Sequence, residues 1–208
     1  MYIFIDESGA FQATQRENQV SCISALVIPE SFAATLFRKF KRLTRDWRDG
    51  GREVKGSTLD ETQIAAVIRL LRRFDVLLFV SCIDMGFHDE NGITAHKNDQ
   101  AQRFLTSITT DTPPTMRAEL EGLATQISTL SNQLYAQSAT LNALVDRATR
   151  AATLYYCQRI PKTLGSFKWR IDAKGENLTP YENLWKTIVM PFLQDRSLKD
   201  PARIGPPW

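Results

Sequence analysis

The sequence predicts an α/β fold built on a mixed sheet, and three patterns carry this prediction. Two apolar runs, Tyr2–Asp6 and Val20–Ile28, enclose a polar stretch that opens with the turn residues Ser8-Gly9. Neighbouring runs of this kind usually pair as an antiparallel hairpin. Later apolar runs alternate with helical patterns, which indicates strands that alternate with helices. The third pattern is a long proline-free segment, which predicts a helical insertion within a single domain of residues 1–208.

The first apolar run is typical of a strand buried on both faces, and it ends in two carboxylates. Consecutive side chains of an extended strand point to opposite faces, so Asp6 and Glu7 are not expected to bind one metal ion together. Asp6 is the predicted ligand, and Glu7 is expected to pair with a basic group or to act indirectly. An ordinary turn would also explain Asp6, Ser8 and Gly9.

A first helix is predicted after Pro29, with Ser31 as its N-cap and Gly50-Gly51 as its end. Large apolar side chains recur along one face of this helix. The opposite face is basic, which fits either a phosphate backbone or the plain solvated face of a helix. The basic residues are Arg38, Lys39, Lys41, Arg42, Arg45 and Arg48.

A second helix is predicted to open with a T-x-x-E capping box at Thr58 and Glu61 and to end near Phe74. The short segment 52–56 between the two helices has the composition of an edge strand. The order of elements up to this point is therefore hairpin, helix, short strand and helix.

The run 76–83 is almost unbroken apolar sequence, which predicts a central strand with Asp84 at its exit. The next residues, 85–98, are predicted to form a loop. Gly86, the Asn91-Gly92 pair and scattered charges break any regular period there.

The segment from Met116 to Ile160 contains no proline, and its one glycine is Gly122. Apolar residues recur in threes and fours, which indicates a heptad seam rather than the broader stripe of a helix lying on a sheet. Residues 113–161 are therefore predicted to form either one long helix or a helical hairpin that folds back near 137–140. A projecting coiled coil would allow a homodimer through residues 116–160. The seam consists of Leu120, Leu123, Ile127, Leu130, Leu134, Leu141, Leu144, Ala148 and Tyr155.

The C-terminal part returns to strand and helix patterns. Apolar and charged residues alternate over Ser166–Asp172, which predicts a strand. The sequence Thr179-Pro180-Tyr181-Glu182 supplies an N-cap, an N1 proline and an N3 acid, so a helix is predicted from there to Leu193. Residues 195–208 are predicted to be a tail.

Composition limits the classes of protein that fit. The chain has 208 residues, 43% apolar content and a formal charge of +3, which suits one well-cored domain and is too small a charge to indicate nucleic-acid binding by itself. Cys22, Cys82 and Cys157 form no CxxC pair, which argues against a zinc finger and suits free thiols in a reducing compartment. No leader pattern is present, and no apolar run approaches the ~18 residues of a membrane span. These features predict a cytoplasmic protein without a membrane partner.

Four acids lie at or near predicted strand ends: Asp6, Glu53, Asp84 and Asp172. Mg²⁺ and Mn²⁺ prefer oxygen ligands and need only a few carboxylates together with water and substrate phosphate. Acids at adjacent strand ends could hold two such ions ~4 Å apart, an arrangement that serves hydrolysis of phosphodiesters. The spacing suggests no serine–histidine or cysteine–histidine pairing, and the chain has no phosphate-binding glycine loop. An acid cluster is therefore the predicted hydrolytic chemistry.

Simpler explanations exist for several of these residues. Glu53 and Lys55 share a face at period two, so they could form a surface ion pair. Asp172 stands beside Lys174 on a strand face that also carries Lys168 and Arg170. That basic face suits a phosphate-bearing substrate and is equally compatible with solvent exposure.

Three segments together resemble the bacterial and phage domain-of-unknown-function family 3800. The opening Tyr2–Gly9 resembles the N-terminal signature of this family, and Glu53-Val54-Lys55-Gly56-Ser57 resembles its second acidic motif. The segment Trp169–Lys174 resembles the later strand that carries an acid. The resemblance extends over most of the chain, although each motif is short.

The resemblance implies an RNase H-like sheet and a metal-dependent nuclease. It implies Asp6, Glu53 and Asp172 as ligands of Mg²⁺ or Mn²⁺, with Asp84 matched by position only as a fourth. Lys55 or Lys174 would bind the phosphate of a nucleic-acid substrate. Each of these roles is expected only of the residues that match the motifs of the family.

One feature departs from the family pattern. Members of the family continue into a C-terminal helix with a Gln-x-Ala-Asp-like motif, and the segment after Leu193 contains none. A truncated or decayed copy that lacks its last ligand is therefore a second expectation. The alternative function is a non-catalytic binding or assembly module that uses the heptad segment for self-association. A third is a degenerate nuclease that binds nucleic acid without cutting it.

Overall fold

The computed structural model describes residues 1–14, 18–47, 54–171, 183, 185–189 and 191. These residues form an α/β fold with five α-helices and one open, mixed sheet of four strands. The strands are β1 Tyr2–Ser8, β2 Val20–Ile28, β3 Leu77–Asp84 and β4 Lys168–Ile171. The α-helices are α1 Glu30–Leu43, α2 Glu61–Leu71, α3 Glu90–Thr106, α4 Pro114–Thr129 and α5 Asn132–Arg159. Short helical turns are η1 Arg45–Trp47, η2 Gly56–Thr58, η3 Met85–Phe87, η4 Pro161–Gly165 and the π-helical turn η5 Trp185–Val189.

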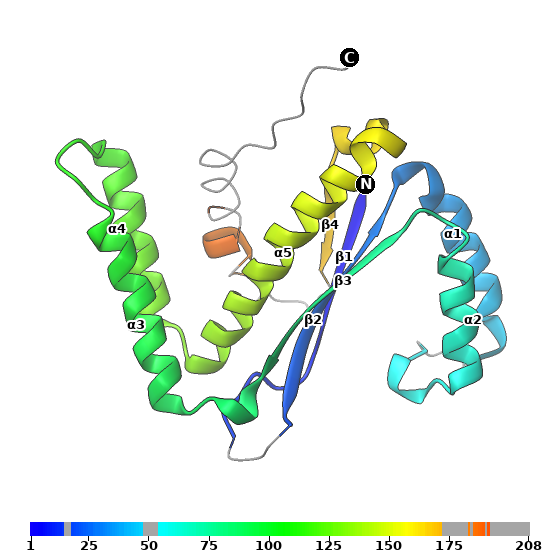
Figure 1. The fold of residues 1–208 in the computed structure, drawn as a ribbon, viewed down its shortest axis with the longest axis horizontal. Helices are drawn as coiled ribbons and strands as arrows, with labels where there is room; N and C mark the ends of the chain where they lie inside the picture. The colour runs from blue at the N-terminus through cyan, green and yellow to red at the C-terminus, as the bar shows by residue number, and fades with distance from the viewer. Residues whose placement is uncertain (15–17, 48–53, 172–182, 184, 190, 192–208) are drawn as a thin grey trace.

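The strand order is β3-β2-β1-β4, so β1 is an inner strand (Figure 1). β1 pairs antiparallel with β2, and β2 pairs antiparallel with β3. β4 pairs parallel with β1. The N-terminal hairpin and the mixed sheet predicted from the sequence are therefore confirmed.

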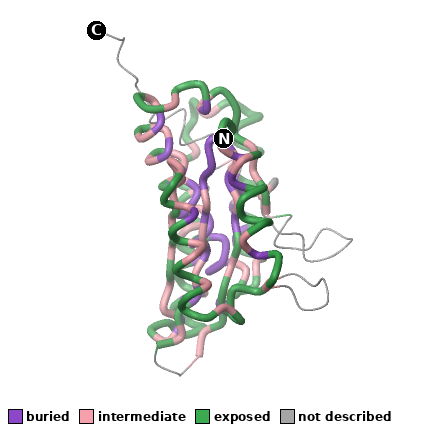
Figure 2. The backbone as a smooth tube through the Cα atoms, turned by 90° about the vertical axis from the view of Figure 1, so that its right-hand side faces the viewer, coloured by how far each residue is buried: buried purple, intermediate pink, exposed green. Residues whose placement is uncertain are grey.

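The sheet has one continuously covered face, which we call the α5 face. Buried side chains of β1 and β2 form the main core together with the inner side of α5. Figure 2 shows the buried residues concentrated in the central layer and more of the exposed residues on the flanking helices. This core contains Ile3, Ile5, Ile23, Ala25, Val27, Leu141, Leu144, Val145 and Ala148.

The other face, which we call the α1–α2 face, is covered over only part of its length. Tyr2 and Phe4 of β1 pack with Leu26 and Ile28 of β2 beneath Ala33, Leu36 and Leu70 of the two helices. Further along the strands, this face is open. Asp6, Ser8, Val80 and Cys82 are exposed there, and Cys22 and Ser24 are half-buried.

The long helical segment consists of two helices that break at Leu130 and Ser131, not near residues 137–140. Ser131 caps α5, because its Oγ accepts a hydrogen bond from the N–H of Leu134 at 3.2 Å. The seam residues Leu141, Leu144 and Ala148 are buried against the sheet. The expectation that the seam would not lie on a sheet is therefore wrong for α5, whose buried face is broader than a heptad seam.

Tyr156 anchors the far end of α5 beside the start of β3. Its side chain is fully buried, and its hydroxyl donates a hydrogen bond to the carbonyl of Asp75 at 2.6 Å. Burial is the main reason why the pKa of the Tyr156 hydroxyl is raised. The residue therefore stays neutral and keeps donating across the whole physiological pH range.

Residues 85–98, predicted as a loop, instead contain η3 and the first half of α3. Asp89 is the N-cap of α3, and its Oδ1 accepts from the N–H of Gly92 at 2.6 Å. Asn91-Gly92 thus lies in a first helical turn rather than in a loop. α3 and α4 pack side by side, away from the sheet (Figure 1).

The second helix begins differently from the prediction. Asp60, not Thr58, is its N-cap, and the capping box is completed by Gln63. Thr58 instead ends the short η2 turn. In segment 52–56, Val54 and Lys55 are the residues that the structure describes before this turn, and they form no strand.

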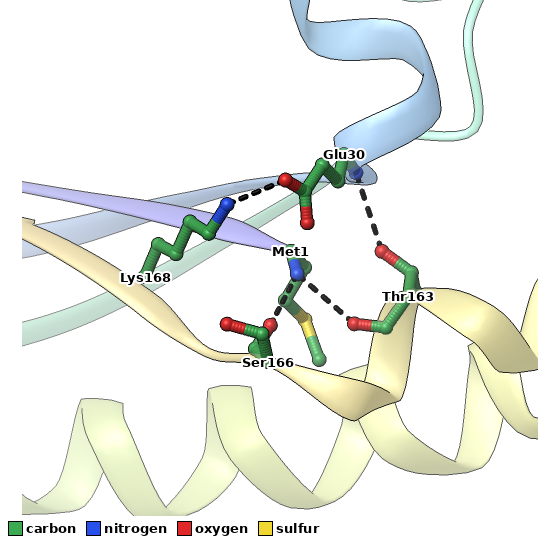
Figure 3. A network of polar contacts seen from close by, with 5 residues as sticks. All are labelled: Met1, Glu30, Thr163, Ser166 and Lys168. Atoms are coloured by element: carbon green, nitrogen blue, oxygen red, sulfur yellow. Dashed lines mark hydrogen bonds and ion pairs between the residues drawn. The ribbon is translucent and has the colours of Figure 1, made fainter.

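A polar network ties the start of β1 to α1 and to the segment before β4 (Figure 3). The amino group of Met1 donates to the carbonyls of Thr163, at 2.9 Å, and Ser166. The N–H of Glu30 donates to Oγ1 of Thr163 at 3.3 Å, and Lys168 forms an ion pair with Glu30. Desolvation lowers the pKa of the Met1 amino group.

Several expectations lie outside the described residues: the start of the last helix at Thr179-Pro180-Tyr181-Glu182 and the tail at 195–208. Within the part that is described, Trp185 packs on Trp169 of β4 with ring centroids 4.9 Å apart. Ile188 and Val189 are buried in the main core. Among the described helices, none combines the length and the apolar character that crossing a bilayer requires.

Candidate functional site

The candidate site lies at the end of β1, where Asp6 reaches the open part of the α1–α2 face. Asp6 shares this face with Tyr2 and Phe4 because side chains alternate along the strand, and it is exposed. Its Oδ1 accepts a hydrogen bond from the N–H of Glu7 at 2.9 Å. An exposed carboxylate held by its own backbone is accessible to a cation from solvent.

Glu7 points to the opposite face, as predicted from strand geometry. The side-chain amide of Gln137 in α5 donates to Oε2 of Glu7. Glu7 is half-buried, and the hydrogen bond joins the end of β1 to the helix that covers the other face. This amide is one partner of Glu7, and it lies on the face opposite Asp6, so Glu7 is not placed to bind an ion together with Asp6.

A tight turn fixes the end of β1. Gly9 has φ +100°, and a Cβ atom at this position would lie 2.5 Å from Oγ of Ser21 and 2.7 Å from its Cα. Two residues later the N–H of Phe11 donates to Oγ of Ser21 at 3.0 Å, and the Phe11 ring is buried in the main core. Ser8-Gly9 therefore forms a turn, as the sequence indicated. The sequence did not show that the backbone of Ser21 lies so close to Gly9 that a side chain at position 9 has no space.

β4 runs beside β1 in the same direction. Ile171, the last described residue of β4, pairs with Ile5 of β1. Asp172, Lys174 and Glu53 lie outside the described residues. Lys55 is described and exposed, and its carbonyl accepts from the N–H of Thr58 at 3.0 Å in the η2 turn.

Asp84 lies far from Asp6 along the sheet. Asp6 pairs with Ser24, Ser24 pairs with Val80, and Asp84 pairs with Val20. Asp84 is therefore four residues beyond the row of Asp6 and two strands away, about 13 Å along the strands and about 10 Å across them. The sheet does not bring these two carboxylates within reach of one ion.

Asp84 has a local structural role instead. Its Oδ1 accepts a hydrogen bond from the N–H of Gly86 at 2.9 Å and caps the η3 turn. Within the described ranges, no group of three or more His, Cys, Asp or Glu side chains is placed to hold a metal ion. Of the predicted acids, Asp6 and Asp84 are the ones that the structure describes, and Asp6 is the exposed one.

The paired helices α1 and α2 carry a surplus of positive charge on their exposed sides. Lys39 of α1 lies 5.6 Å from the ring centroid of Phe74, just past the end of α2, so the two groups of cations are neighbours. Arg45 of η1 forms an ion pair with Asp46 at 3.1 Å. We call this set the basic helix pair: Arg38, Lys39, Lys41, Arg42, Arg45, Arg69, Arg72 and Arg73.

One arrangement in the open area was missed from the sequence. Cys22 and Cys82, sixty positions apart, are direct partners across β2 and β3. Only the strand register could have revealed this, because neither residue has a cysteine nearby in sequence. Comparisons with protein-family models, with curated proteins and with solved structures found no match to this chain.

Proposed function

We propose that the chain is a metal-dependent phosphodiesterase that acts on nucleic acid, with Asp6 as its first metal ligand. The observation that carries the proposal is the position of Asp6: an exposed carboxylate at the end of an inner strand, on the open half of an otherwise covered face. Carboxylate oxygens are the donors that Mg²⁺ and Mn²⁺ prefer.

The register of β4 supports Asp172 as a second ligand. Ile171 pairs with Ile5, and Asp172 and Asp6 are the residues that follow them in the sequence. Asp172 is proposed for this reason, as the residue that follows the last pair of the described register. Glu53 is the proposed third ligand, on the resemblance of its motif to family 3800, and the RNase H-like assignment rests on the same resemblance.

The residues of the chain would divide the work as follows. The acids would hold the ion, and the bound ion would polarise the phosphate and lower the pKa of a water molecule. Lys55 or Lys174 would neutralise charge on the phosphate. The basic helix pair would attract the remaining phosphates of the polymer.

The test is hydrolysis of single- and double-stranded DNA and RNA with Mg²⁺ or Mn²⁺, in which Asp6→Asn is expected to lower the rate at least 100-fold. A 100-fold loss of rate is typical when a group that stabilises the transition state is removed. Asp99→Asn is the matched control, since Asp99 lies exposed on α3 and pairs with Arg103 at 2.8 Å. It should retain full activity.

Both variants must first show native thermal unfolding, so that lost activity is not lost structure. Equal hydrolysis by the native chain and Asp6→Asn would refute the proposal, because it would identify a contaminating enzyme or another site. Absence of hydrolysis in every protein at high concentration would refute it as well.

The basic helix pair favours a second candidate function, nucleic-acid binding without cleavage. We expect a single-stranded oligonucleotide to bind. The logarithm of its association constant should fall linearly with the logarithm of the salt concentration. The double variant Arg38→Gln/Arg42→Gln should reduce the steepness of this dependence by about 1.4, since each phosphate contact with a single strand contributes about 0.7. The double variant Arg103→Gln/Arg117→Gln, on α3 and α4, is the control and should leave the slope unchanged. Fluorescence anisotropy over a salt series measures both, and a salt-independent affinity would contradict the expectation.

The alternative function, self-association through the heptad segment, has little support from the most apolar residues of that segment. Leu141, Leu144 and Ala148 are buried within the core of a single chain, so they cannot also line a dimer. Any self-association through residues 116–160 would need exposed side chains such as Met116 and Leu154.

A further inference from the structure

Two of the three cysteines face each other across the open part of the α1–α2 face. Cys22 of β2 and Cys82 of β3 are direct partners in the antiparallel register. Partners of this kind have Cα atoms about 4.5–5.5 Å apart and side chains on the same face. Disulfides need Cα separations of roughly 4.4–6.8 Å, so the backbone already has the spacing of a disulfide.

The two thiols are reduced and adjacent in this structure. Both are free cysteines, and the register sets them opposite each other on one face of the sheet. Burial, with a smaller contribution from the neighbouring Cys82 thiol, raises the pKa of the Cys22 thiol to about 11. This influence of one thiol on the other agrees with the short separation that the register gives.

The pair is also accessible. Cys82 is exposed and Cys22 is half-buried. Val80, the neighbour of Cys82 on the same strand face, is 42% exposed, so the helices α1 and α2 do not cover this area. A small molecule can therefore reach Cys82 from solvent, whereas most structural cysteines are shielded.

We propose that Cys22 and Cys82 form a reversible cross-strand disulfide, a modification site for small-molecule disulfides of the glutathione class. This proposal does not depend on nuclease activity. It rests on the strand register that pairs the two thiols and on their exposure.

The chemistry is two thiol–disulfide exchanges. The Cys82 thiol loses its proton, and its sulfur attacks one sulfur of glutathione disulfide, which expels one glutathione thiolate and leaves a mixed disulfide on Cys82. The Cys22 thiol then loses its proton and attacks Sγ of Cys82, which expels the second glutathione thiolate. Two protein thiols are oxidised, one glutathione disulfide is reduced, and the two released protons go to the two glutathione thiolates.

Cys82 is the attacking residue and Cys22 the resolving one. Cys82 is the more exposed thiol, and the pKa of Cys22 keeps its thiol protonated near neutral pH. The second step is intramolecular between directly paired residues, so its high effective concentration offsets the small thiolate fraction of Cys22. The mixed disulfide on Cys82 is therefore expected to be short-lived.

The bond would alter the surface beside Asp6. The row Ser8–Cys22–Cys82 lies two residues along the strands from the row Asp6–Ser24–Val80, so the two are neighbouring rows on this face of the sheet. A disulfide would tie β2 to β3 at this level and replace two polar hydrogens by an apolar bridge. It would also close a loop of sixty residues, from Cys22 to Cys82, that contains both α1 and α2.

The direct test is equilibration of the full chain in glutathione buffers of increasing oxidised fraction, followed by acid quenching, alkylation of free thiols and intact mass measurement. The native chain is expected to lose two of its three alkylatable thiols together, without a glutathione adduct. Peptide mapping should then show the link between residues 22 and 82. The oxidised protein should unfold at a temperature roughly 5–10 °C higher.

Variants separate the two positions. Cys157→Ser is the matched control, because Cys157 lies apart on α5 with its Sγ donating to the carbonyl of Leu154 at 3.1 Å; it should behave like the native chain. Cys22→Ser should accumulate a glutathione adduct on Cys82, since the resolving thiol is gone. Cys82→Ser should form no internal disulfide.

A second probe needs no oxidant. Phenylarsine oxide bridges two thiols that lie within reach of one arsenic atom, so it should consume both cysteines in the reduced native chain and in Cys157→Ser. In Cys22→Ser and in Cys82→Ser, the one remaining cysteine of the pair should form no stable adduct with the arsenic atom. A disulfide that includes Cys157, a disulfide between chains, or three thiols that stay free throughout the glutathione series would each overturn the proposal.

Discussion

Replacement of Gly9 by alanine is expected to destabilise the fold by about 3 kcal/mol, from backbone strain at positive φ together with overpacking. The added methyl group would lie 2.7 Å from the Cα of Ser21. Backbone cannot move aside as a flexible side chain could, so β1 and β2 would have to separate near the turn. Such a shift also endangers the hydrogen bond from Phe11 to Ser21. Chemical denaturation of Gly9→Ala against the native chain measures the loss.

Gly122→Ala is the control for this prediction. Gly122 lies inside α4, and an added Cβ would have nothing within 4 Å apart from its chain neighbours and the backbone of its own helix. Alanine there should stabilise the helix by about 0.5–1 kcal/mol, because glycine pays more backbone entropy. If Gly9→Ala were as stable as Gly122→Ala, the close packing at the end of β1 would be disproved.

Replacement of Leu144 by alanine is expected to cost about 3–4 kcal/mol and to lower the unfolding temperature by roughly 8–12 °C. Leu144 is fully buried in the core between α5 and the sheet. Truncation removes apolar contacts and leaves a cavity that the surrounding helix and strands can fill only in part. Differential scanning calorimetry provides both quantities.

Leu154 on the same helix gives the matched comparison, because its side chain is 74% exposed. Leu154→Ala should change the stability by less than about 0.5 kcal/mol. Similar losses for the two variants would mean that α5 does not dock on the sheet as described.

The strands were the most predictable part of the fold. Two long apolar runs bounded by turn residues gave β2 at Val20–Ile28 and β3 within one residue of Leu77–Asp84. A long apolar run predicts a strand from composition alone. It does not predict the place of the strand in the sheet: β3 was expected to be central, but it is an edge strand with Leu78 64% and Val80 42% exposed. The turn signal at Ser8-Gly9 was equally local, so the hairpin followed from it.

Helix α3 could not be recognised because its buried side is not apolar throughout. Lys97 is 8% exposed, and its ammonium group donates to the carbonyl of Leu130 at 2.7 Å, close to the end of α4. The buried face of α3 consists of Ile93, Lys97 and Ala101. Because lysine is polar, it interrupts the apolar periodicity by which a helix is recognised in a sequence. Its burial is stabilised by a carbonyl from another element, which sequence patterns do not contain.

The sequence predicted the surroundings of single residues of the candidate site, but not which of them lie close together. The apolar run before Asp6 indicated a carboxylate at a strand end, and strand alternation separated Glu7 from it, as the structure confirms. Asp84 looked equivalent in sequence, but its row in the sheet depends on pairing between distant strands. The register that separates Asp84 from Asp6 is the same register that joins Cys22 to Cys82, and neither could be read from local sequence.

The parallel pairing of β1 with β4 has a consequence for how the chain reaches this fold. Residues 2–5 bond to residues 168–171, whereas the antiparallel meander of β1, β2 and β3 needs only the first 84 residues. During synthesis, β1 would therefore have an unpaired edge until most of the chain has left the ribosome. Contacts of such high sequence separation slow folding, and a bare strand edge invites pairing with other chains. We expect nascent or unfolded chains to be most prone to aggregation before β4 docks.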